Sequence, residues 1–175
     1  LLTGGSVALN SGAAISGGEL QLFDSSLTLG GNVGMTNDST LGLRNTTINP
    51  GSYTIGMTGG TLGLGGTYSD FGAVQTDNAT SLELNANTSI TRSAPLEIGG
   101  LDLNAFALTL GSATTDLTIH STLAVDSSGS QLITNAADLI LTYPLQLSAG
   151  LISSTGGIYT LTQGGTVEGT GELDV

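Results

Sequence analysis

The fold of this chain is decided by one short apolar triplet that occurs seven times: Leu20-Gln21-Leu22, Leu41-Gly42-Leu43, Leu62-Gly63-Leu64, Leu82-Glu83-Leu84, Leu101-Asp102-Leu103, Leu123-Ala124-Val125 and Leu145-Gln146-Leu147. The copies follow one another after 21, 21, 20, 19, 22 and 22 residues. An apolar residue at every second position is typical of a short strand with one buried face. Such a strand cannot bury that face alone, whereas copies stacked above and below it can. The repeat therefore predicts a solenoid of β-strands.

The composition agrees with a thin aliphatic core. Of the 175 residues, 38% are hydrophobic but only 4% are aromatic, and 28 are glycines that suit tight corners. Charged residues make up 9%, well below the usual share of about a quarter. Disordered chains combine low hydropathy with high charge, whereas the mean hydropathy here is positive. We therefore expect an ordered chain.

The charge of the chain excludes several classes of partner. Fourteen acidic residues face two arginines and no lysine, which gives a formal net charge of −12. Nucleic-acid binding and adhesion to anionic lipid both need clustered basic side chains, so we expect neither. No run of about 18 apolar residues is present, so we expect no membrane insertion. The absence of cysteine excludes disulfides and thiol ligands for a metal.

Each turn of about twenty residues has room for two further short strands beside its triplet. In the turn that starts at Glu19, apolar alternation marks strands over residues 20–22, 27–29 and 33–35. We therefore predict an all-β fold, a right-handed parallel β-helix of about eight coils of 19–22 residues with three short sheets. Residues 1–175 form a single β-helix segment, which would be roughly 40 Å long at about 4.8 Å per coil.

The apolar members of the triplets should stack as one internal ladder. A charge placed in this ladder would be buried without a partner and should stop local folding. The ladder consists of Leu20, Leu22, Leu41, Leu43, Leu62, Leu64, Leu82, Leu84, Leu101, Leu103, Leu123, Val125, Leu145 and Leu147.

The register of the repeat extends toward both ends of the sequence. Leu1 lies 19 residues before Leu20, and Val167 lies 22 residues after Leu145. Neither end offers an amphipathic helix or a charged cap, and an uncovered strand edge pairs with any strand it meets. We therefore expect that the coils continue in a longer chain or that copies join end to end in a filament.

These features together resemble the β-helices of bacterial surface proteins. The Leu-x-Leu triplets, the Gly-Gly corners, the richness in Asn, Ser and Thr and the absence of Cys are similar to passenger domains of autotransporters and to filamentous-haemagglutinin-type adhesins. The resemblance implies export across a Gram-negative envelope and a role at the cell surface. It implies an extracellular structural or adhesive rod, with neighbouring coils, further copies or cell-surface glycans as partners, and no enzymatic activity.

Two pairs of acidic residues are candidates for calcium binding. Glu83 and Asp102 take the outward place in consecutive triplets, and Asp116 and Asp138 are spaced like a second stacked pair. Carboxylates about 4.8 Å apart repel one another, and Ca²⁺, which prefers oxygen ligands, could bridge them. The alternative is that these side chains simply extend into solvent. No other cofactor is expected.

A carbohydrate-active enzyme, either a lyase or a tailspike-like glycosidase, is the alternative function. Paired carboxylates can act as general acid and base when they lie about 5–10 Å apart. A lyase would also need a cationic group, and Arg44, Arg92 and the single histidine, His120, are the only candidates. They are spread over different coils, so the sequence favours a structural role over catalysis.

The outer surface offers few other recognition signals. The outward column of the triplets carries no threonine, which argues against an ice-binding ladder. The aromatic residues are too few for an evident sugar-binding platform. We expect Phe71 and Phe106 to fill the core and Tyr143, beside Pro144, to be the most exposed ring.

Overall fold

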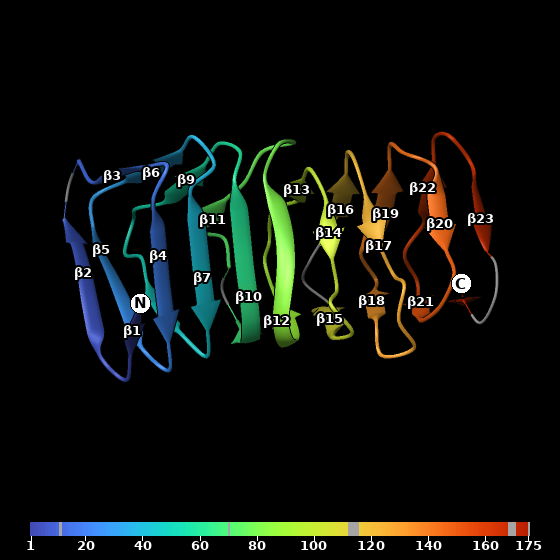
Figure 1. The fold of residues 1–175 in the computed structure, drawn as a ribbon, viewed down its shortest axis with the longest axis horizontal. Coiled ribbons are helices and arrows are strands. Elements are labelled where there is room, and N and C mark those ends of the chain that lie inside the picture. The colour runs from blue at the N-terminus through green and yellow to red at the C-terminus, as the bar shows by residue number, and fades with distance from the viewer. Residues whose placement is uncertain (11, 70, 112–115, 168–170, 175) are drawn as a thin grey trace.

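The chain forms a parallel β-solenoid of about eight turns (Figure 1). The structure is a computed structural model that describes residues 1–10, 12–69, 71–111, 116–167 and 171–174. Every strand pair in the described residues is parallel. These residues contain no helix, and hence no helix that could cross a membrane.

Successive strands lie on three faces, as the three-strand coil predicts. The first face carries the triplets and consists of β1 (Leu2–Thr3), β4 (Glu19–Phe23), β7 (Thr40–Arg44), the start of β10 (Thr61–Tyr68), the start of β12 (Ser81–Ile90), β14 (Leu101–Asp102), β17 (Leu123–Ala124), β20 (Leu145–Leu147) and β23 (Gly165–Val167). The second face consists of β2 (Ser6–Asn10), β5 (Ser26–Gly30), β8 (Thr47–Asn49), the ends of β10 and β12, β15 (Ala107–Leu110), β18 (Gln131–Asn135), β21 (Leu151–Ser154) and β24 (Glu172–Asp174). The third face consists of β3 (Ala14–Ser16), β6 (Val33–Thr36), β9 (Ile55–Met57), β11 (Val74–Gln75), β13 (Leu96–Ile98), β16 (Asp116–Ile119), β19 (Asp138–Leu141) and β22 (Tyr159–Leu161). We number the coils from 1, so coil 3 begins with β7 and coil 4 with β10.

The predicted leucine ladder is confirmed. Leu20 pairs with Leu41, and the same column then continues through Leu62, Leu82 and Leu101 to Leu123. All members of the ladder are buried except Leu20 and Leu123, which are partly buried. Because each leucine packs on the one above and the one below, a narrow tube acquires a continuous apolar interior.

The register at the two ends differs from the prediction. Leu2, not Leu1, stacks in the ladder, where it pairs with Leu22, and Leu1 is 84% exposed. At the other end Leu145 pairs with Gly165, so that β23 stands two residues earlier than the expected Val167. Both shifts have one cause, because these coils contain a different number of corner residues from their neighbours.

The expected positions of the aromatic rings are confirmed in outline. Phe71 is fully buried and meets the ring of Tyr68 edge-on, with a centroid distance of 5.3 Å. Phe106 is partly buried against the core, and Tyr143 is 54% exposed.

Polar side chains at the corner between the first and second faces satisfy buried carbonyl groups. In four consecutive coils, the carbonyl of the last triplet residue accepts a hydrogen bond from a side chain of the following coil. The donors and acceptors are Thr46 to Leu22 (2.8 Å), Tyr68 to Leu43 (2.9 Å), Thr88 to Leu64 (3.3 Å) and Asn104 to Leu84 (3.1 Å). A carbonyl oxygen can accept two hydrogen bonds, and these side-chain bonds hold each corner on the coil below.

In the described residues each face is interrupted once. Because β10 and β12 run from the first face into the second and join them, the strands form five hydrogen-bonded sheets. The second face is interrupted between β8 and the end of β10, and the third between β11 and β13. On the first face, only a single bridge from Val125 to Leu147 connects β17 with β20. The three interruptions lie at different coil junctions, so at least two faces remain paired at each of them.

Candidate functional site

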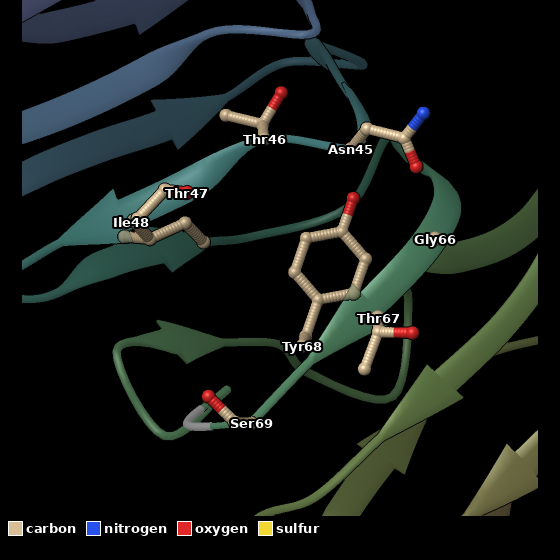
Figure 2. A pocket seen from close by; sticks show the side chains of 8 residues that line it. All are labelled: Asn45, Thr46, Thr47, Ile48, Gly66, Thr67, Tyr68 and Ser69. Atoms are coloured by element: carbon tan, nitrogen blue, oxygen red, sulfur yellow. The ribbon is translucent and has the colours of Figure 1, made fainter.

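The interruption of the second face opens a slot between coils 3 and 4 (Figure 2). The slot has a volume of about 390 Å³ and is lined by residues 45–48 on one side and 66–69 on the other. On the lower side, β8 pairs only with β5, and on the upper side Gly66–Tyr68 pair only with Thr88–Ile90.

The slot is closed at both ends. At the corner with the first face, the Asn45 N–H donates to the Gly65 carbonyl at 2.8 Å. At the start of the third face, the Ile55 N–H donates to the Ala73 carbonyl, also at 2.8 Å. The opening is therefore a bounded recess in the wall, and the coils resume normal pairing on either side of it.

The two strands that border the slot differ in phase, that is, in which of their residues point into the core. In coil 3 the first buried side chain after the triplet is Thr46, three residues after Leu43, whereas in coil 4 it is Tyr68, four residues after Leu64. Because side chains alternate between the faces of a strand, a one-residue shift reverses which of them point inward. Gly66 accommodates the change with a φ of 108°.

Tyr68 forms the floor of the slot. Its side chain is buried, and its hydroxyl donates toward the carbonyl groups of Leu43 (2.9 Å) and Gly65 (3.1 Å). Burial raises the pKa of Tyr68 above its ordinary value, although backbone hydrogen bonds act in the opposite direction. The phenol is therefore a neutral structural donor, and Figure 2 shows its hydroxyl directed toward Asn45 and Thr46.

Uncharged polar groups line the walls of the slot. The side chains of Thr47, Thr67 and Ser69 are exposed, and Asn45 uses its amide NH₂ to donate to Asp24 Oδ1 at 3.1 Å. No charged residue is among the lining residues that the structure describes.

The main chain adds further polar groups to the slot. The Thr47 N–H donates away from it, to the Ser25 carbonyl, and the Tyr68 carbonyl accepts from the Thr91 N–H on the opposite side. Main-chain groups alternate sides along a strand, so those of Ile48 and Thr67 point into the slot. The slot thus presents N–H, C=O, hydroxyl and amide groups above an apolar floor. This site was not predicted from the sequence, where the local signal is a pair of glycines, Gly65 and Gly66, of which Gly65 stands opposite Arg44 of the preceding coil.

The carboxylate pairs stack as the sequence predicts. Glu83 pairs in register with Asp102 on the first face, and Asp116 with Asp138 on the third. Within the described part of the chain, no group of three or more His, Asp or Glu side chains could hold a metal ion. Calcium at these pairs stays a prediction.

Two of these carboxylates also have local structural partners. Asp102 Oδ1 accepts from the Asn104 N–H at 2.9 Å, and Asp138 Oδ1 accepts from the Ile158 N–H at 2.8 Å. Each therefore orders a corner of the backbone while its second oxygen atom remains available to solvent or a cation.

The cationic candidates for catalysis have structural positions. Arg92 is 6% exposed and donates to the carbonyls of Ala94 (2.8 Å) and Val74 (3.3 Å) near the interruption of the third face, and burial lowers its pKa. Arg44 lies over the ring of Phe23, 4.6 Å from its centroid. The structure does not bring the two arginines and His120 together.

His120 has a partner that the sequence analysis did not identify. Its Nε2 lies 2.7 Å from Oε1 of Glu97, and the two side chains are 28% and 54% exposed. Ile98 pairs with Ile119 on neighbouring coils, and this brings the two side chains together because Glu97 precedes Ile98 and His120 follows Ile119. An exposed pair of this kind on neighbouring coils ties two turns together at the surface.

A second hollow surrounds the exposed ring of Tyr143. It has a volume of about 350 Å³ and is lined by Pro144, Gln146 and residues 121–123. The ring stands at the corner between the third and first faces, where β19 ends and β20 begins. It is a shallow surface feature, in contrast to the slot, which is set into the wall between two coils.

Comparison with protein-family models, with curated proteins and with solved structures finds no match for this chain. The function must therefore be argued from the geometry of the solenoid and of the groups on its surface.

Proposed function

We propose that the chain is a structural and adhesive segment of an extracellular bacterial surface protein, in which a stiff rod holds a binding surface away from the cell. The observation that carries this proposal is the continuous pairing of the first face from β1 to β17. Backbone hydrogen bonds between coils run along the axis, so each coil is held by its neighbours and stability accumulates by stacking.

The staggered interruptions also favour a mechanical role. Where the second face is interrupted, the first and third faces remain paired. At each of the other two interruptions, the two faces that are not interrupted likewise remain paired. A rod with all three interruptions at one junction would bend or separate there. Distributing them over three junctions keeps the cross-section connected along its whole length.

The surface chemistry is compatible with adhesion to uncharged partners. Only 9% of the residues are charged, and Asn, Ser and Thr side chains are abundant. Such a surface offers hydrogen-bonding groups of both kinds with little electrostatic selectivity. The slot and the hollow at Tyr143 are recessed regions of this surface, and hydroxyl and amide groups line the slot.

The proposal is tested by measuring stiffness and adhesion separately. Small-angle X-ray scattering should give the profile of one rigid rod, and limited proteolysis should leave the coils intact. Beads that carry the folded chain should bind bacterial or host cells more strongly than beads that carry a Leu84→Asp variant, with a Glu83→Gln variant as the matched surface control. A flexible, protease-sensitive chain, or beads that bind no cells, would contradict the proposal.

A further inference from the structure

We infer that the slot between coils 3 and 4 binds a neutral sugar unit. This inference deepens the proposed function, on which its biological role rests, because it names a ligand class and a site for adhesion. It starts from the interruption of the second face, which leaves main-chain groups of β8 and β10 directed at one another without pairing.

The polar groups of the slot match the chemistry of a polyol. The hydroxyls of Thr47, Thr67 and Ser69 can each donate and accept, and the main-chain groups of Ile48 supply one donor and one acceptor. Sugar hydroxyls also donate and accept at every position. A ligand with several adjacent hydroxyl groups can therefore satisfy this lining at many points at once.

The apolar groups of the slot match the apolar C–H face of a sugar ring. Ile48 is partly buried and Tyr68 is buried, and both border the slot beneath the hydroxyl groups. The C–H groups of a pyranose present an apolar surface that could pack on this floor. Polar groups that fix orientation around an apolar floor are the usual arrangement of a small-molecule site, and the volume of about 390 Å³ lies within the usual range.

Charge indicates that the ligand is neutral. No basic residue is among the described residues that line the slot, and Asp24 lies beside it through its hydrogen bond to Asn45. The chain has a net charge of −12. Sulfated, phosphorylated or carboxylated ligands would meet repulsion without a compensating cation.

The closed ends favour a compact ligand over an added peptide strand. Unpaired strand edges often take up an extended peptide, which needs a continuous edge along which to run. Here the hydrogen bonds from Asn45 to Gly65 and from Ile55 to Ala73 close the recess on either side. A single sugar unit, or the end of a longer glycan, fits such a bounded recess.

Binding is tested with defined sugars and slot variants. The probes are glucose, galactose, mannose and N-acetylglucosamine, with sialic acid as the anionic comparison, and binding is followed by NMR shift mapping of the labelled chain. We expect at least one neutral sugar to shift the amide signals of Ile48 and Thr67, and sialic acid to shift neither. A Thr47→Val/Thr67→Val double variant should bind about tenfold more weakly, because two hydroxyl contacts are lost.

Two further variants keep the test decisive. Thr67→Trp should fill the slot and abolish binding, whereas Thr28→Trp places the same side chain on the same face in coil 2 and should leave binding unchanged. Circular dichroism confirms that both variants are folded. The inference is overturned if no neutral sugar binds, if Thr67→Trp binds as well as the unaltered chain, or if only the peptide acetyl-Ser-Leu-Thr-Leu-Gly-amide shifts the slot signals.

The same variants separate this inference from the adhesive function. If the Thr67→Trp chain still adheres to cells while sugar binding is lost or was never present, the slot is not the adhesive site and the adhesive rod stands. If sugars bind the slot but no cells are bound, the site stands and the adhesive function is contradicted.

Discussion

Coils 2 and 3 pack on one another in full register, whereas coils 3 and 4 do so on two faces only. At the first junction, β4, β5 and β6 pair with β7, β8 and β9. At the second junction, β7 and β9 pair with β10 and β11, but β8 has no partner in coil 4 among the described residues. Both junctions are paired on the first and third faces, so they differ in the pairing of the second face and in the core, where coil 4 buries Tyr68 and Phe71.

The corner sets the phase of the strand that follows it. Ser25 and Thr46 are buried three residues after the triplets of coils 2 and 3, while Tyr68 and Thr88 are buried four residues after those of coils 4 and 5. Coils 2 and 3 have the same phase and pair on the second face, whereas coils 3 and 4 differ in phase and do not. Coils 5 and 6 also differ in phase by one residue, yet they pair through Thr88 and Leu108, so phase alone does not decide pairing. The recess between coils 3 and 4 coincides with a one-residue change at the corner and with the burial of Tyr68 and Phe71 in the core of coil 4.

The largest expected effect concerns the leucine ladder of the first face, which runs through both junctions and continues into coil 5. Leu84→Asp places a carboxylate in the fully paired ladder of the first face, where the leucine is 1% exposed. We expect a loss of about 4 kcal/mol or more in the free energy of unfolding, because the charge has no partner. Thermal unfolding followed by circular dichroism measures it. The neighbouring outward change Glu83→Gln should stay within about 0.5 kcal/mol, and a stable Leu84→Asp chain would break the account of the ladder.

The corner donors provide a closer comparison of the two junctions. Tyr68→Phe removes the donor to the Leu43 carbonyl at the slot, and Thr46→Val removes the donor to the Leu22 carbonyl at the regular junction. The register of the first face also directs the Gly65 N–H to the Leu43 carbonyl and the Arg44 N–H to the Leu22 carbonyl. Each change therefore removes one of two hydrogen bonds to its carbonyl, and we expect each to cost about 1 kcal/mol in denaturant unfolding. Equal losses would show that tyrosine has replaced threonine in the same role. No loss for Tyr68→Phe would mean that the main-chain hydrogen bond from Gly65 is sufficient for that carbonyl.

Asp77 ties coils 3 and 4 together at the far corner from the slot. Its Oδ1 accepts from Thr80 Oγ1 (2.8 Å) and from the N–H groups of Gly59 and Ala79 (3.1 Å each). Burial raises its pKa, but these hydrogen bonds together outweigh burial and hold the pKa below its ordinary value.

The pH dependence of stability follows from that direction. The carboxylate contributes its full stabilisation above the ordinary carboxyl pKa and loses it as the pH falls through the lowered value. We expect Asp77→Ala to cost about 1 kcal/mol at neutral pH and little at pH 2. Melting curves across this range test the prediction. An equal cost at both pH values would show that the negative charge contributes nothing.

The smallest expected effect concerns the carboxylate pairs, which lie at junctions that are paired on all three faces. Glu83 and Asp102 repel one another across coils 5 and 6, as Asp116 and Asp138 do across coils 6 and 7. If Ca²⁺ bridges these pairs with millimolar affinity, 10 mM Ca²⁺ should raise the melting temperature by a few degrees, and a chelator should reverse this. A Glu83→Gln/Asp116→Asn variant should lose most of the increase. Identical melting curves with and without Ca²⁺ would contradict calcium binding.

The sequence predicts the first face well because its signal is local and repeated. Two leucines two residues apart indicate both the strand and its buried side, and their spacing gives the pairing in the next coil. The carboxylate pairs were predicted for the same reason, since Glu83 and Asp102 occupy equivalent places in consecutive triplets.

The slot could not be predicted in the same way, because it depends on a difference between two coils. Gly65, Gly66 and Thr67 suit an ordinary corner when considered alone, and only the buried position of Tyr68 reveals the change of phase. The pairing register of the first and last coils was predicted wrongly for a similar reason. Corner lengths vary from coil to coil, so extrapolating the triplet spacing beyond Leu20 or Leu145 gave a register shifted by one or two residues.

The comparison of the two junctions is tested most directly by amide hydrogen exchange at equivalent positions. Leu27 and Ile48 pair with one another in β5 and β8, and each directs its N–H toward the following coil. The account predicts that the Ile48 amide, which faces the slot, exchanges about 100-fold faster or more than the Leu27 amide, which faces a paired strand. Equal protection of the two amides would show that coils 3 and 4 pair on the second face after all, and would contradict the account.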